Sequence, residues 1–95
     1  MSMKEAYRQK IEAQLDEWEA EIDKMKAKAD KVGANVQLEY YKRIEELRLK
    51  HESVKVRLKE LKGASEGAWE DLKIGVDLAW EALSEAMKSA NSRYK

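Results

Sequence analysis

The chain has 95 residues, no cysteine, no proline, and 19 acidic and 19 basic side chains. These properties exclude disulfides and thiolate metal sites, and the zero net charge argues against a dedicated nucleic-acid-binding protein. Charged residues make up 40% of the sequence, a composition typical of long helices and coiled coils. We therefore expect one small all-α domain over residues 1–95.

Apolar residues recur at steps of three and four from residue 7 to residue 61, which is the spacing of a coiled-coil seam. Between Val32 and Val36 this row passes a glycine, Gly33, and the step of four keeps the helical phase. The preserved phase favours one long helix over residues 3–62, because glycine inside a helix costs only about 1 kcal/mol relative to alanine.

The charges around Gly33 indicate an alternative, which is a turn at residues 33–35. On each side of the glycine, acids come first and bases last, an order that the dipoles of two separate helices prefer. Gly33 would then end one helix, and Asn35 would cap the next. In that arrangement the chain is a compact three-helix bundle with its hinge at residues 33–35. The sequence leaves both arrangements open and favours the long helix.

A second break is marked at residues 63–66. Gly63 follows two lysines, which favours a helix end, and Ser65 is a candidate N-cap followed by acids. We expect the last helix over residues 66–93, folded back as an antiparallel helical hairpin. Small side chains such as Gly75 line one of its flanks and large ones such as Trp80 the other, so this helix should contact two neighbours.

The last helix would cover only the second half of the long helix. A second chain running antiparallel would cover the first half, with acids of residues 12–23 facing bases near residues 45–57. We therefore predict a homodimer, related to the three-helix bundle by a domain swap at Gly33. The residues expected in the oligomer and packing seam are Ile11, Leu15, Trp18, Ile22, Met25, Val36, Tyr40, Ile44, Leu47, His51, Trp69, Leu72, Val76, Trp80 and Leu83.

The sequence contains no glycine-rich phosphate loop, no nucleophile–base pair and no metal-ligand cluster. We therefore predict a non-enzymatic protein without catalytic residues, cofactor or metal. His51, the single histidine, occupies a seam position, and we interpret it as a polar residue that sets helix register. The alternative is a pH switch between two copies of the chain.

Several charged and aromatic segments are distinctive, namely Leu15-Asp16-Glu17-Trp18, Glu21-Ile22-Asp23-Lys24 and Ala68-Trp69-Glu70-Asp71-Leu72-Lys73. With these segments the chain resembles a family of small bacterial coiled-coil stress-response proteins, and the resemblance covers nearly its whole length. It implies a bacterial source and a link to stress. Beside self-association, we expect a helical protein as a possible partner. The family has no established activity, so the resemblance implies no catalytic residues.

A second function class is a peripheral membrane or lipid-associated stress protein that acts through the tryptophan-containing last helix. Acids such as Glu81 on the polar face of this helix would be repelled by anionic lipid, so membrane contact is the less favoured prediction. No apolar run approaches the roughly 20 residues that span a bilayer, and no signal-peptide core is present. We therefore expect a cytoplasmic protein.

Overall fold

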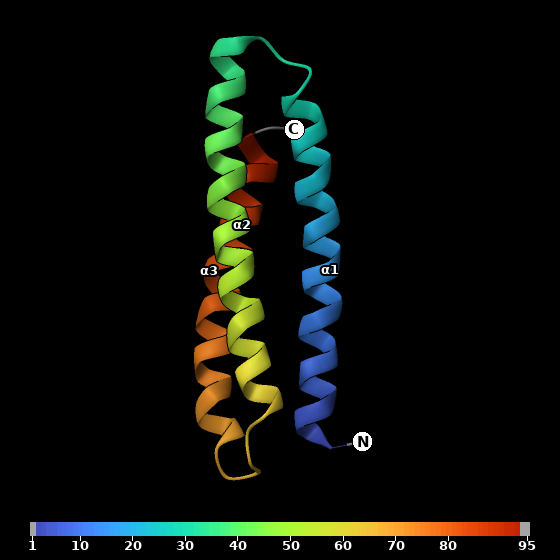
Figure 1. Ribbon diagram of the computed structural model, residues 1–95, viewed down its shortest axis with the longest axis vertical. Coiled ribbons are helices and arrows are strands. Elements are labelled where there is room, and N and C mark those ends of the chain that lie inside the picture. Colours follow the sequence, from blue (N-terminus) through green and yellow to red (C-terminus); the bar gives the residue numbers. More distant parts are fainter. Residues whose placement is uncertain (1, 94–95) are drawn as a thin grey trace.

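The computed structural model describes residues 2–93, which form three α-helices (Figure 1). They are α1 (Met3–Ala29), α2 (Ala34–Lys62) and α3 (Trp69–Arg93). The chain runs up α1, down α2 and up α3, and the bundle measures 51 × 19 × 19 Å. The predicted all-α class is confirmed. Of the two predicted arrangements, the chain adopts the three-helix bundle.

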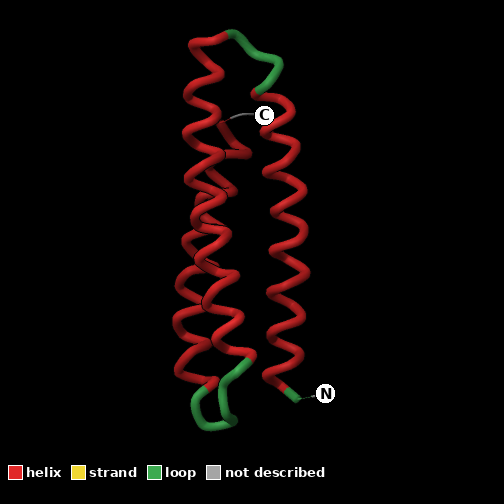
Figure 2. The backbone as a smooth tube through the Cα atoms, in the orientation of Figure 1, coloured by secondary structure: helices red, strands yellow, loops and turns green. Residues whose placement is uncertain are grey.

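The prediction of one helix over residues 3–62 is wrong, because the helix ends at Ala29 and restarts at Ala34 (Figure 2). Folding back at this point buries the apolar face of α1 against the other helices of the same chain, which a lone rod would leave in water. Asp30 caps α1, and its backbone N–H donates to the carbonyls of Lys26 and Lys28. The turn therefore comes before Gly33, although the apolar row keeps its phase.

Gly33 occupies the N-cap position of α2, so the predicted roles of Gly33 as a C-terminal cap and Asn35 as an N-cap are both wrong. Its backbone is extended, with φ −65° and ψ 155°, and its carbonyl accepts from the N–H groups of Val36 and Gln37. No described residue of the chain has a positive φ. The turn thus does not require the left-handed conformation that favours glycine.

The second connection lies where the sequence predicts it, between Gly63 and Trp69. The carbonyl of Ser65 accepts from the N–H groups of Ala68 and Trp69, which leads the chain into α3. The helix itself begins at Trp69, three residues later than expected. Lys4 at the start of α1 donates from its Nζ to the carbonyl of Ala64 at 2.8 Å, so α1 also contacts this connection.

The core runs the length of the bundle between the three helices. The α2–α3 contact is close on the small flank of α3, where a Cβ placed on Gly75 would lie 3.1 Å from the Arg57 guanidinium. Large aromatic side chains instead fill the space between α1 and α3. Gly75 thus contacts α2 and Trp80 contacts α1, as two different neighbours of α3 require, whereas Ala82 and Ser89 of the predicted small flank are exposed. The buried apolar residues are Ile11, Leu15, Trp18, Ile22, Met25, Ala29, Ile44, Leu47, Val54, Leu58, Leu61, Trp69, Val76, Leu83, Met87 and Ala90.

Candidate functional site

The residues predicted for the seam fall into three groups in the structure. Most of them are buried between helices of the one chain: Ile11, Leu15, Trp18, Ile22, Met25, Ile44, Leu47, His51, Trp69, Val76 and Leu83. A second group is partly buried against this core: Tyr40, Leu72 and Trp80. Val36 alone among them is exposed, with half of its side chain accessible. Its placement in the seam is wrong for the closed bundle, because α2 has only just begun there and no helix covers that side.

Two aromatic pairs join α1 to α3. The ring centroids of Trp18 and Trp80 lie 5.4 Å apart with their planes tilted by 34°, and those of Tyr7 and Trp69 lie 6.5 Å apart. Such tilted pairs contribute about 0.5–1.5 kcal/mol beyond the burial of their surface. The tryptophans of α3 therefore act as core residues in this fold.

Tyr7 also makes polar contacts with α3. Its hydroxyl donates to a carboxylate oxygen of Asp77, and the Lys73 Nζ lies 5.1 Å from the centre of its ring. Burial, followed by the hydrogen bond and negative charge of Asp77, raises the pKa of Tyr7. The neutral phenol is therefore the form that the folded chain stabilises.

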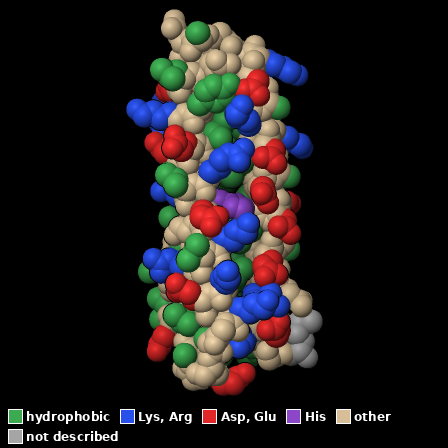
Figure 3. Space-filling model, in the orientation of Figure 1, with side chains coloured by type: hydrophobic (Ala, Val, Ile, Leu, Met, Phe, Trp, Pro, Cys, Tyr) green, Lys and Arg blue, Asp and Glu red, His purple; other side chains and the backbone are tan. Residues whose placement is uncertain are grey.

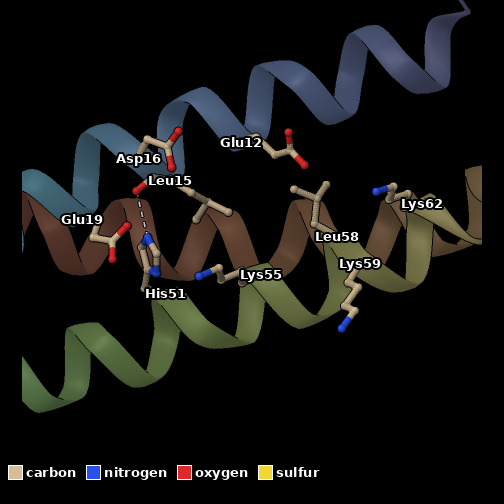
Figure 4. Close-up of a pocket in the computed structure, with 9 residues that line it drawn as sticks. All are labelled: Glu12, Leu15, Asp16, Glu19, His51, Lys55, Leu58, Lys59 and Lys62. Carbon is tan, nitrogen blue, oxygen red and sulfur yellow. Dashed lines mark hydrogen bonds between the residues drawn. The ribbon is translucent and has the colours of Figure 1, made fainter.

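A groove of about 350 Å³ lies between α1 and α2 (Figure 4). One wall carries acidic side chains from α1 and the other carries lysines from α2, above an apolar floor. Figure 3 shows the histidine in this groove, with acidic and basic side chains around it. The residues that line the groove are Glu12, Leu15, Asp16, Glu19, His51, Lys55, Leu58, Lys59 and Lys62.

His51 links the two walls of this groove. It is buried, and its Nε2 lies 2.8 Å from the carbonyl oxygen of Leu15 on α1 (Figure 4). A protonated Nε2 donates to this carbonyl, which satisfies a polar atom in an otherwise apolar seam. The contact is specific to one alignment of α1 on α2, so His51 occupies the position of a polar residue that sets helix register.

The charges of the two walls are complementary. Arg48 of α2 lies 3.3 Å from Asp23 of α1, next to the groove where the other acids of α1 face lysines of α2. The sequence predicted that acids of residues 12–23 would meet bases near residues 45–57, but in a partner chain. In the closed bundle the two sets meet within one chain.

The turn at residues 30–33 is held by side chains that sequence reasoning missed. Gln37 donates from its amide to the carbonyl of Ala29 at 3.0 Å, and the Tyr41 hydroxyl donates to Asp30. The Lys26 ammonium lies 2.7 Å from the same Asp30 carboxyl. The hydrogen bond from Lys26, and after it the one from Tyr41, lowers the pKa of Asp30. The contacts of Gln37 and Tyr41 join α2 to the end of α1 across the turn, so no periodic pattern in the sequence could have revealed them.

Within residues 2–93, no three His, Asp or Glu side chains are grouped so that they could hold a metal ion. No described helix has the length and apolar character needed to cross a membrane. What the geometry offers is recognition between helices, through an apolar seam, aromatic pairs and matched charges.

The fold and these contacts define the chain as an antiparallel three-helix bundle of coiled-coil type. No protein-family model matches the sequence, and comparisons with curated proteins and with solved structures find no significant match.

Proposed function

We propose that the protein is a non-enzymatic structural or interaction protein that associates with helical chains, in the first place with further copies of itself. The observation that carries this proposal is the matched pair of surfaces on α1 and α2. An acidic wall and a basic wall meet across an apolar seam, with Asp23 on Arg48 and Leu15 on His51. Surfaces of this kind can pair within a chain or, at high protein concentration, between chains.

Exposed apolar side chains on α2 and α3 support binding to further helices. Leu49 and Val56 on α2 are seven residues apart, with 66% and 48% of their surface accessible. Ile74 and Leu78 on α3 are four residues apart and similarly exposed. Spacings of four and seven place such residues on one helical face, as in helix-in-groove recognition.

Sedimentation velocity over a wide range of protein concentration tests the self-association. We expect the 11.0 kDa chain to form a dimer as its concentration rises. A monomer at every concentration would contradict the proposal.

We further propose that the protein acts in the cytoplasm of a bacterium during stress, on the strength of its resemblance to the coiled-coil stress-response family. Its abundance in its source cells should rise under heat, osmotic or oxidative challenge. Constant abundance under all three challenges would exclude this role.

The lipid-associated function is less well supported by the positions of the tryptophans. Trp69, Val76 and Leu83 are buried in the core, so α3 could present them to a membrane only if the bundle opened. Co-sedimentation with vesicles separates the two functions. Salt-resistant binding to vesicles would favour the lipid function over the one proposed.

A further inference from the structure

We propose that α1 exchanges between two copies of the chain, with the turn at residues 30–33 as the hinge. In the exchanged form the turn straightens, so that α1 and α2 become one helix. Each α1 then packs on α2 and α3 of the other copy. The inference rests on the proposed self-association, and it names the partner as a second copy of this chain and the shared surface as the buried side of α1.

The first argument is the helical phase across the hinge. Val32 and Val36 are four residues apart, so straightening the turn places them on the face that already carries the apolar residues of α1 and α2. A turn that served only to reverse the chain would have no need to preserve this phase. The same sequence therefore encodes both a bundle and a continuous amphipathic helix.

The second argument is the register between α1 and α2. Leu15 contacts His51, Asp23 contacts Arg48 and Asp30 contacts Tyr41, at separations of 36, 25 and 11 residues. The separation between the paired residues decreases toward the turn at residues 30–33, as it does in any antiparallel helix pair that the turn connects. In the exchanged dimer the same register continues through the two-fold axis and places Val32 of one chain opposite Val36 of the other.

The exchange thus covers a residue that the bundle leaves exposed. Half of the Val36 side chain is accessible in the closed form, and Val32 is only partly buried. Two copies meeting at the two-fold axis would cover both valines. Apart from the Gln37–Ala29 hydrogen bond at the turn, the described side-chain contacts of α1 with α2 and α3 would form again between chains. The closed and exchanged forms therefore differ mainly at the hinge.

The third argument is that little in the hinge resists straightening. A Cβ on Gly33 would meet nothing within 4 Å and no residue of the turn has a positive φ, so the closed turn does not depend on glycine and alanine fits it without strain. Lys26 and Asp30 are spaced to stay paired inside a continuous helix, and Asp30 would meet Tyr41 of the other copy. Gln37 makes the one described side-chain contact that exchange replaces, since a continuous helix supplies a backbone N–H to the Ala29 carbonyl.

Cross-linking between α1 and α2 distinguishes exchange from any other dimer. The chain has no cysteine, so Asp23→Cys with Arg48→Cys places a single pair of thiols across the α1–α2 contact. A short bis-maleimide should join them within one chain in dilute protein. After incubation at high concentration, the cross-link should join two chains and give a covalent dimer on a denaturing gel.

Two variants in this background shift the hinge in opposite directions. Ala34→Pro suits the closed form, because proline is favoured at the first position of a helix and Gly33 before it is already extended. Inside a continuous helix the same proline should disfavour exchange by roughly a hundred-fold per chain. Gly33→Ala should favour exchange by roughly five-fold per chain, since alanine replaces glycine in a helix interior. Circular dichroism confirms that each variant remains helical.

The proposal predicts interchain cross-links that increase in Gly33→Ala and disappear in Ala34→Pro. A dimer that contains only intrachain cross-links would overturn the exchange while leaving self-association intact. Equal interchain cross-linking in both variants would also overturn the hinge assignment. A monomer in sedimentation at every concentration, for the parent and for Gly33→Ala, would overturn the exchange and the proposed function together.

Discussion

The two connections of the bundle both contain glycine, but they are held in different ways. The connection at residues 63–68 lies between Leu61 and Trp69, which are both buried, and it also accepts a hydrogen bond from Lys4 of α1. The turn at residues 30–33 has a buried residue, Ala29, on one side only. Beyond it, the first large apolar residue of α2, Val36, is exposed, and polar side chains hold the turn.

This difference indicates where the chain can open. Opening the second connection would disturb the buried residues Leu61 and Trp69 on its two sides and the Lys4 hydrogen bond. Opening the turn at residues 30–33 by exchange would break the Gln37–Ala29 hydrogen bond and would cover the exposed Val36. In our proposal the two glycine-containing connections therefore have different roles, the second as a fixed reversal and the first as a hinge.

The largest expected effect comes from the core beside the second connection. Leu61 is fully buried, so Leu61→Ala should lower the free energy of unfolding by about 2–5 kcal/mol. The matched variant beside the hinge is Val36→Ala, which should change it by less than about 0.5 kcal/mol in dilute protein, because the side chain is exposed. Urea unfolding monitored by circular dichroism measures both. Equal losses would remove the distinction between the two connections.

A smaller effect is expected at Tyr7, which joins α1 to α3 near the second connection. Tyr7→Phe removes the hydrogen bond to Asp77 and should cost about 1 kcal/mol at neutral pH. Because the pKa of Tyr7 is raised in the folded state, its contribution is full below the ordinary value of 10.0 and is lost as the pH rises above it. Thermal unfolding of parent and variant should therefore converge in alkali. A constant difference between the two proteins up to high pH would contradict this assignment.

Lowering the pH should weaken the turn at residues 30–33 by protonating Asp30. The pKa of Asp30 is lowered by its hydrogen bonds with Lys26 and Tyr41, so its contribution is present above the ordinary value of 3.8 and is lost as the pH falls below it. Asp30→Asn should remove this part of the acid dependence. Amide hydrogen exchange at residues 30–33, measured on dilute protein at descending pH, reports the turn directly. Protection in the parent should fall more steeply with acid than in the variant, and parallel profiles would show that Asp30 does not hold the turn.

The smallest effect is expected at the N-cap of α2. Gly33→Ser adds a side-chain cap where the structure has none, and should stabilise the closed bundle by about a few tenths of a kcal/mol. Gly33→Ala lacks that cap and serves as the control. Chemical unfolding of dilute protein should rank serine above alanine. The reverse order would mean that the cap does not form and that the turn differs from the one described.

The periodicity of the sequence was enough to predict the fold class, the fold-back of α3 and the contrast between its flanks. Gly75 lies near Arg57 of α2 and Trp80 lies against Trp18 of α1, so these two flank residues of α3 do contact two different helices. Matched charges also predicted that acids of residues 12–23 would lie near bases of residues 45–57, although the prediction placed them in two chains and the Asp23–Arg48 pair forms within one. These features depend on helical spacing, which the sequence displays directly.

The turn at residues 30–33 could not be predicted in the same way. The apolar row keeps its phase there, and two of the residues that hold the turn, Gln37 and Tyr41, lie inside α2 and are neither caps by position nor turn formers by type. Gln37 and Tyr41 act only once the chain has folded back, across 8 and 11 residues. The long-helix form and the three-helix bundle differ in whether α1 is covered by α2 and α3 of its own chain or of a second chain. Both forms use the same contact residues, so the sequence pattern alone does not distinguish them.

The most direct test of this account is solution X-ray scattering with mass determination, before and after incubation at high concentration. Dilute protein should have a mass of 11.0 kDa and a radius of gyration near the 15.3 Å of the Cα atoms in the closed bundle. After incubation a fraction should have twice that mass and an extended form longer than the 51 Å bundle. An extended particle in dilute protein would contradict the closed bundle. A compact monomer at every concentration would contradict the hinge.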